Sequence, residues 1–290
     1  MVLGMDELVR VSDLVAAFDV DLAVSSLSAS GVLGEVHVEF FDRVFDVPSG
    51  GAHRFSRGPD GSFANVGVTD EKLAPSPRGV LVEVPSPMFM AAPLTEYGEL
   101  PRALDALVVS PTWALASSAY VMHRVPLDAA GAFEDPRVRV PGPLVRAAIA
   151  LLSDLSSFSV APVGGRVFVR ATSPSGVLCA LVDQVEVVAI KDFGFAAPAI
   201  VSTVDVEPGA LAVLAELPIN LSFVPDADGV ASLVTGCVES FAAVDAELFA
   251  RGAAAFDAPM VSVAVGCMGT PLVLSDGTDR QVMVATLVHR

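Results

Sequence analysis

The sequence predicts an α+β protein made of two similar halves, in which antiparallel strands predominate. Two observations support this fold class. The last residues, 260–290, read as three short strands joined by turns at 266–269 and 276–279. Gly and Asp in those turns supply the backbone angles that tight turns need. In addition, helix-like and strand-like segments follow one another in the same order twice along the chain, which indicates an internal structural repeat.

The first half begins with a predicted helix at 6–18, where apolar residues recur at helical spacing. The stretch 46–61, rich in Gly, Pro, Ser and Arg, is expected to be a surface loop. Ser86 and Pro87 are typical of a helix start, so a helix is expected at 86–100. Alternating apolar residues predict the strands of this half, at 21–28, 34–40, 63–68, 79–84, 104–109 and 113–125.

The second half follows an acidic connector at 127–136. Gly164 and Gly165 predict a hairpin turn. Its strands are expected at 137–140, 157–161, 166–171, 177–190, 200–206 and 219–224, before the three closing strands. Its helices are expected at 141–155, 208–217 and 226–243, and the stretch 244–255 is an extra segment.

Composition narrows the class of protein. Hydrophobic residues make up 53% of the 290 residues and charged residues 18%, and the mean hydropathy is +0.62. The longest uncharged run, 258–275, contains Pro and Gly and alternates apolar with small residues, which is typical of strand-turn-strand rather than of a membrane helix. No signal peptide is expected from the acidic N-terminus. The three cysteines are far apart in apolar runs and are expected to be reduced thiols in an intracellular compartment.

The net charge of −17 argues against nucleic-acid binding by an evenly charged surface. Fifteen arginines and two lysines oppose 34 acidic residues, so any contact with phosphates requires that arginines cluster.

Motifs for enzymatic chemistry are weak in this sequence. The Gly-rich stretch 49–61 has no Walker lysine, and residues 226–229 lack the later ligands of a calcium loop. No Gly-x-Ser-x-Gly motif is present, although a Ser-His-Asp site assembled from distant positions stays open. The four histidines do not pair with cysteines at zinc spacing: His37, His53, His123 and His289. We therefore expect no cofactor, no metal and no enzymatic activity.

Several short motifs carry a resemblance to a known family. They are Arg137-Val-Arg-Val-Pro, Gly165-Arg-Val-Phe-Val-Arg, Pro259, Gly269-Thr-Pro-Leu-Val-Leu and Val282-Met-Val-Ala-Thr-Leu. With the order of elements, they resemble the PCNA-like DNA sliding-clamp superfamily, and among clamps a subunit of the nine-one-one DNA-damage checkpoint clamp. The resemblance implies a two-domain clamp fold with domains at 1–127 and 137–290 joined by 128–136. Each domain would have antiparallel outer sheets and two helices lining the ring interior.

The resemblance also implies partners and sites. The subunit would form a ring with two other clamp subunits, be opened by a clamp loader, encircle double-stranded DNA through phosphate contacts, and recruit repair, checkpoint or replication proteins in the nucleus. Arg10, Arg102 and Arg146 would face DNA. Leu127 and Phe133 of the connector would dock clients, and Arg54 and Arg57 would make further contacts from the loop at 46–61.

A second class of function remains open at this point. High apolar content and low charge also suit a β-rich viral capsid or other structural assembly subunit. An enzyme of unknown class is the third possibility, and nothing in the sequence favours it.

Overall fold

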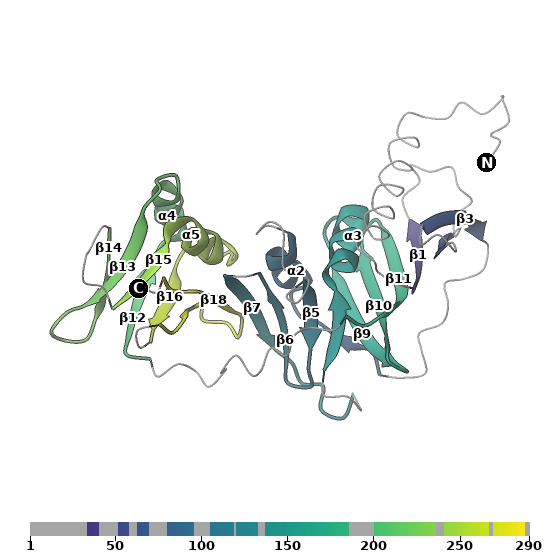
Figure 1. Cartoon of the computed structure of the whole chain (residues 1–290), viewed down its shortest axis with the longest axis horizontal. Helices are drawn as coiled ribbons and strands as arrows, with labels where there is room; N and C mark the ends of the chain where they lie inside the picture. Colours follow the sequence, from purple (N-terminus) through teal and green to yellow (C-terminus); the bar gives the residue numbers. More distant parts are fainter. Residues whose placement is uncertain are drawn as a thin grey trace. The chain divides into compact units, whose positions relative to one another are not determined.

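A computed structural model describes residues 34–40, 52–57, 63–69, 80–95, 105–118, 120–132, 137–185, 200–235, 241–266 and 269–287 (Figure 1). For the first three of these ranges only the backbone is described. The chain divides into two compact units. Unit 1 comprises residues 1–88, 108–111 and 129–185, and unit 2 comprises residues 89–107, 112–128 and 186–290. The contiguous domains expected from the sequence, 1–127 and 137–290, stay a prediction.

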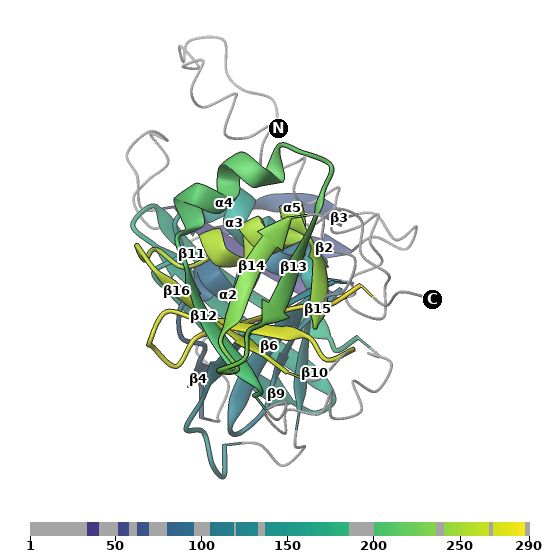
Figure 2. The same cartoon turned by 90° about the vertical axis from the view of Figure 1, so that its left-hand side faces the viewer.

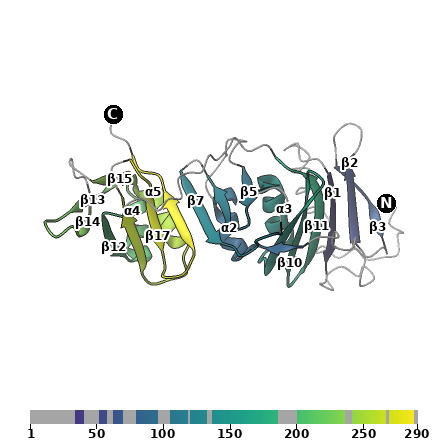
Figure 3. The same cartoon turned by 90° about the horizontal axis from the view of Figure 1, so that it is seen from below.

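A seven-stranded antiparallel sheet forms the framework of unit 1, in the order β3-β2-β1-β11-β10-β9-β4. Figure 3 shows β1, β2 and β3 side by side at one edge of this sheet. Gly164 and Gly165, both at positive φ, turn β9 into β10 as the sequence predicts. The strands are β1 (Gly34–Phe40), β2 (Ala52–Arg57), β3 (Phe63–Thr69), β4 (Val82–Glu83), β9 (Ser157–Val163), β10 (Arg166–Ser173) and β11 (Gly176–Asp183).

Helix α3 (Gly142–Leu152) packs on β10 and β11 of this sheet. It follows β8 (Val138–Pro141), and prolines at 141 and 143 set its start because proline suits the first helical turn. Leu144, Ala148 and Leu152 recur every four residues and are buried, so α3 presents one apolar face to the sheet.

The larger sheet of unit 2 has the order β12-β16-β17-β18-β7-β6-β5. Strands β16, β17 and β18 alternate buried and half-buried residues, which is the pattern of a sheet with one face in the core, whereas β5 is buried throughout. They are β5 (Ala106–Val109), β6 (Trp113–Ser117), β7 (Val121–Pro126), β12 (Ser202–Val206), β16 (Val261–Val265), β17 (Leu272–Ser275) and β18 (Gln281–Val284). Of β5, Val108 and Val109 belong to unit 1, where β8 pairs with this strand.

A three-stranded sheet and three helices complete unit 2. Figure 2 shows β13 and β14 side by side in this sheet, whose order is β14-β13-β15. Helices α4 and α5 pack against each other. Gly252 of α5 allows a close approach to β18, since a Cβ there would lie 3.0 Å from Val284 Cγ2. The elements are α2 (Pro87–Thr95), β13 (Asn220–Pro225), β14 (Ala231–Thr235), β15 (Ala242–Asp245), α4 (Pro208–Ala215) and α5 (Ala246–Ala254).

One arrangement of elements recurs along the chain: a strand, a helix, then antiparallel strands. It occurs as β4-α2-β5-β6-β7, as β8-α3-β9-β10-β11, as β12-α4-β13-β14 and as β15-α5-β16-β17-β18. Successive copies exchange their first strands, since β4 pairs with β9 and β8 with β5, and then β12 with β16 and β15 with β13. A repeat is therefore present within the described residues, with a unit shorter than the two halves expected from the sequence. Within the described residues, the copy that contains α4 has two strands after its helix instead of three.

The prediction of a helix at 226–243 is wrong. The structure has a turn, then β14 and later β15 in this stretch. The Asp226 carboxylate accepts hydrogen bonds from the backbone N–H groups of Asp228 and Val230, and Gly229 has a φ of +78°. This side-chain turn competes with helix formation, and Gly at positive φ ends any helical run.

Two other expectations also need correction. The extra segment at 244–255 is helix α5, which Asp245 caps by accepting the N–H of Leu248. The loop expected at 46–61 contains strand β2, so Arg54 and Arg57 lie on a strand. The other predicted helices within the described residues are present as α2, α3 and α4, and α3 and α4 are shorter than expected. The three closing strands are confirmed as β16, β17 and β18.

Candidate functional site

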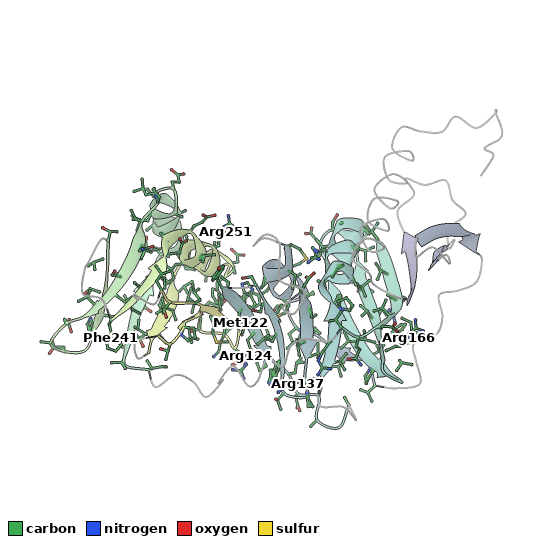
Figure 4. All side chains as sticks on the ribbon, viewed as in Figure 1. Met122, Arg124, Arg137, Arg166, Phe241 and Arg251 are labelled. Carbon is green, nitrogen blue, oxygen red and sulfur yellow. The ribbon has the colours of Figure 1, made fainter. Side chains whose placement is uncertain are left out.

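Antiparallel strand pairs join the repeated copies to one another and form the first candidate surface. In unit 2, β7 of one copy pairs with β18 of another, with Val282 opposite His123 and Met283 opposite Met122. Arg124, labelled with Met122 in Figure 4, donates from Nη1 to Gln281 Oε1 at 3.3 Å across this pair. In unit 1, β11 pairs with β1 over seven residue positions. Both pairings are antiparallel and lie inside sheets of this chain.

The helices form the second candidate surface. The four described helices carry two arginines and one glutamate between them: Arg146 on α3, and Glu247 and Arg251 on α5. Arg251, labelled in Figure 4, forms an ion pair with Glu247 one turn earlier. Helices α2 and α4 have no charged residue. Together, the described helices therefore carry little net charge.

The residues predicted for DNA contact are only partly within the described chain. Arg146 lies on α3 and is half-buried. Arg10 and Arg102 lie outside the described residues. The strand β2 places Arg54 beside His37 of β1 and Gly67 of β3 in the pairing register, with a bulge between Arg54 and Phe55. The DNA-facing role of all these residues stays a prediction.

The connector is ordered at its beginning. Leu127, half-buried, donates its backbone N–H to the Thr112 carbonyl at 2.9 Å. Ala129 donates to the Pro111 carbonyl at 2.8 Å. Phe133 lies outside the described residues. The client-docking role of this segment stays a prediction.

A buried aromatic cluster fastens α2 to unit 2. The His123 ring, fully buried, has its Nδ1 2.7 Å from the Phe89 carbonyl, and it lies 4.5 Å from the Phe89 ring. Burial lowers the pKa of His123 to about 4, although the hydrogen bond with Phe89 opposes this shift. The imidazole is therefore neutral near pH 7 and serves packing rather than proton transfer. Phe256 packs on the other side, 5.6 Å from Phe89.

Arg280 connects this cluster to the turn between β17 and β18. Its guanidinium carbon lies 5.4 Å from the centre of the Phe89 ring and 5.8 Å from that of Phe256. It also forms an ion pair with Asp276, whose side chain is 4% exposed. Burial alone would raise the pKa of Asp276, but hydrogen bonds from Thr278 and Arg280 outweigh burial and hold this pKa below its usual value. The ion pair between Arg280 and Asp276 thus stabilises the turn, and the guanidinium group of Arg280 also contacts the rings of Phe89 and Phe256.

Within the described residues, His, Cys, Asp and Glu side chains form no group of three or more suited to a metal ion. Likewise, the described helices include none long and apolar enough to cross a membrane. Trp113 lies half-buried on β6, where it is part of the sheet.

Comparison with known proteins addresses the fold. No protein-family model matches the chain, and no curated protein matches it. Among solved structures, it is similar to the Helicobacter pylori beta clamp bound to a DNA ligase peptide, with 10% identity, 93% of this chain and 98% of that chain covered, and a TM-score of 0.55. The DNA polymerase sliding clamp from Bacillus subtilis is 7% identical in sequence, with 96% of this chain and 97% of that chain covered and a TM-score of 0.55. The DNA polymerase sliding clamp from Caulobacter crescentus is 14% identical in sequence, with 85% of this chain and 79% of that chain covered and a TM-score of 0.52.

The chain therefore has the DNA sliding-clamp fold. At identities of 7–14% the likeness establishes the fold, with its antiparallel sheets and few helices, as the sequence predicts. The finer resemblance to a nine-one-one subunit finds no counterpart among these neighbours, which are bacterial clamps.

Sequence reasoning missed helix α5. The stretch 244–255 was read as an addition to the fold, although Phe249, Ala253 and Phe256 recur at helical spacing.

Proposed function

We propose that this protein is a non-enzymatic clamp subunit that forms a ring around double-stranded DNA and recruits other proteins to it. The observation that carries this proposal is the sliding-clamp fold, in which strand-helix-strand copies are joined by antiparallel strand pairing, as β7 of one copy is with β18 of another. Copies added in this way extend a sheet, and head-to-tail addition closes a ring when the rotation between subunits suits. The nearly neutral helices favour topological retention of DNA over tight binding.

Two forms of the proposal differ in assembly and client. The motifs near the C-terminus favour a checkpoint clamp of the nine-one-one type, with two other subunits, in the nucleus. The fold neighbours are named DNA polymerase sliding clamps, which favours a replication role. A clamp loader would open either ring, and the peptide in the Helicobacter pylori structure suggests that clients dock as peptides.

Native mass spectrometry of the protein, alone and after purification from its own cells, tests the assembly. A closed ring of identical copies supports the replication form, and one copy bound to two partners of similar size supports the checkpoint form. A large shell or an inert monomer would overturn the clamp proposal, and the shell would favour the capsid class instead.

Retention on DNA tests the encircling. The purified assembly is loaded, with its loader, on a nicked circular plasmid and washed at high salt. We expect it to stay on the circle and to be lost when one restriction cut makes the plasmid linear. Equal retention on circular and linear DNA would contradict encirclement.

A further inference from the structure

The dipeptide Asp-Gly occurs three times in the sequence, and two of the three lie within the described residues: Asp228-Gly229 and Asp276-Gly277. An Asp carboxyl group reacts most readily with the next backbone nitrogen when that residue is Gly, because no side chain hinders the approach. Both glycines have a positive φ, +78° and +82°, and each lies in the turn of a hairpin, β13–β14 or β17–β18. The two turns therefore place the same dipeptide in different surroundings. The third, Asp60-Gly61, lies outside the described residues.

The turn between β13 and β14 leaves the Asp228 side chain open to water. All four residues from Asp226 to Gly229 are exposed. Within the described part of the chain, the Asp228 carboxylate accepts no hydrogen bond and forms no ion pair. The Gly229 N–H donates to the Asp226 carbonyl at 3.1 Å, so this hydrogen bond has to open before the nitrogen can react. Water can replace it at an exposed turn, so the opening costs little.

The turn between β17 and β18 holds the Asp276 side chain in place instead. This side chain is 4% exposed and forms an ion pair with Arg280. It also accepts hydrogen bonds from the backbone N–H of Thr278, at 3.1 Å, and from the Thr278 hydroxyl. Burial would raise the pKa of Asp276, but the hydrogen bonds from Thr278 and Arg280 hold this pKa below its usual value. The neutral carboxyl group, which is the form that can lose water, is therefore scarce at this position.

We propose that Asp228 is a site of spontaneous modification, at which Asp228-Gly229 converts slowly to an isoaspartyl linkage, and that the contacts of Asp276 protect it from the same reaction. The Gly229 backbone nitrogen attacks Cγ of Asp228 and forms a new C–N bond. The hydroxyl of the carboxyl group leaves with the amide proton as water. Water then adds to either carbonyl of the cyclic imide, and the C–N bond that breaks decides whether Asp or isoaspartate results. One water leaves and one returns, so the reaction needs no further reactant.

The product changes the β13–β14 hairpin. An isoaspartyl residue carries the backbone through its side chain, so the turn becomes longer by a carbon atom and an α-carboxylate projects from it. The Asp226 N–H donates to the Val230 carbonyl at 2.9 Å, and the Val230 N–H donates to Asp226 Oδ1 at 2.9 Å. Both hydrogen bonds depend on the length of chain between these residues. Within the described sheet β14 pairs with β13 alone, so a longer turn weakens the hold on β14.

Ageing of the purified full chain tests the reaction. The protein is kept for weeks at a pH of about 6, where a small fraction of Asp carboxyl groups is neutral. Peptide mapping with electron-transfer fragmentation distinguishes isoaspartate from Asp at each of the Asp-Gly dipeptides. We expect isoaspartate to accumulate at Asp228 and to exceed that at Asp276 at least about tenfold, because the second turn has to open its ion pair first. Amide exchange in β14 should become faster as the modified fraction rises.

Variants separate the two turns. Asp228→Glu keeps the charge but requires a larger and less favourable ring, so isoaspartyl-type modification of this turn and the change in β14 exchange should both be lost. Arg280→Ala removes the ion-pair partner of Asp276 and should raise isoaspartate there about threefold or more, with Asp228 unchanged. Arg251→Ala is the matched control, since it breaks the ion pair with Glu247 instead and should alter neither turn. Circular dichroism checks that all variants fold.

Several results would overturn the proposal. They are no isoaspartate at Asp228 in the aged chain, equal amounts at Asp228 and Asp276, and modification of the turn that persists in Asp228→Glu. An Arg280→Ala chain in which Asp276 stays unmodified would overturn the protection assigned to its contacts. The inference goes beyond the ring proposal and does not depend on it, because the reaction takes place within one chain. Its outcome is independent of plasmid retention, so its failure and that of the clamp proposal can be told apart.

Discussion

Residues 137–185 and 200–287 have the same order of strand, helix and strands but opposite charge. The first segment has five arginines and two aspartates, a net charge of +3. The second has two arginines and eleven acidic residues, a net charge of −9. Both bury alternate residues in some of their strands, such as Phe158 and Val160 in one and Val261 and Val263 in the other. The spacing of the buried residues thus determines the fold, and the exposed residues are free to differ in charge between the two segments.

The exposed apolar residues follow the same division. Of the ten large hydrophobic residues that are exposed within the described chain, none lies in 137–185 and seven lie in 200–287. The seven are Ile200, Val201, Val213, Leu217, Val230, Met260 and Leu287. The two segments therefore differ both in net charge and in exposed apolar surface.

The largest expected effects come from the two cores. Phe249 is fully buried and meets Phe223 edge-on at 5.4 Å in unit 2, and Phe158 is buried in unit 1. Phe249→Ala and Phe158→Ala should each lower the free energy of unfolding by about 3–5 kcal/mol. The single tryptophan, Trp113, belongs to unit 2 and reports its unfolding by fluorescence.

If the two units unfold separately, Phe249→Ala lowers the denaturant midpoint of the tryptophan signal, and Phe158→Ala leaves it in place while shifting part of the circular dichroism signal. Equal shifts of the fluorescence and circular dichroism signals in both variants would show that the two units unfold together. The two units would then differ in their surfaces and not in their stability.

Acid should destabilise unit 2 through His123. Its pKa is about 4 when folded and 6.5 in the unfolded chain, so between these values only the unfolded chain binds the proton. Stability is complete above pH 6.5, falls by about 3 kcal/mol as the pH drops to 4, and then levels off. Urea titrations at pH 7, 6, 5 and 4 measure this loss. A His123→Gln variant removes the titrating group, and an unchanged slope in that variant would assign the loss to other residues.

Two arginines of the acidic segment should differ in importance. Arg280→Ala leaves the buried carboxylate of Asp276 without its partner and removes a cation from two aromatic rings, so about 2–3 kcal/mol of stability should be lost. Arg251→Ala breaks an exposed pair with Glu247 and should cost about 0.5 kcal/mol or less. Thermal unfolding compares the two variants, and equal losses would refute the locked turn at 276–280.

The sequence predicted strands better than it predicted surfaces. Residues 261–265, 272–275 and 281–284 alternate cleanly and are bounded by turns, and the structure has strands there. Residues 226–243 misled because Val230, Leu233 and Val234 fit helical spacing equally well, and the hydrogen bonds of Asp226 decided for a turn. Short apolar runs fit both periods, so tertiary contacts select between them.

The candidate sites were harder to predict for a physical reason. Single positions such as Arg146 can be assigned to a helix from spacing, but the partner of a side chain comes from distant segments. Nothing local shows that Arg280 meets Phe89 and Phe256, or that His123 is buried below α2. Charge per segment needs no structure, and it already divides 137–185 from 200–287.

The smallest expected effect concerns DNA affinity, and it tests the comparison directly. Arg146→Gln removes the one charged residue of α3, so non-specific binding of duplex DNA at low salt should weaken about two- to fivefold, and the salt dependence should fall by about one phosphate contact. Arg251→Gln, on the acidic segment, is the matched control and should change neither quantity, because Glu247 already compensates its charge. Anisotropy titrations of a labelled duplex at about 50, 100 and 200 mM salt would measure both the affinity for DNA and its salt dependence. If Arg146→Gln and Arg251→Gln weakened DNA binding equally, the basic segment would contribute no more to DNA affinity than the acidic one. The difference in net charge between the two segments would then have no effect on DNA binding.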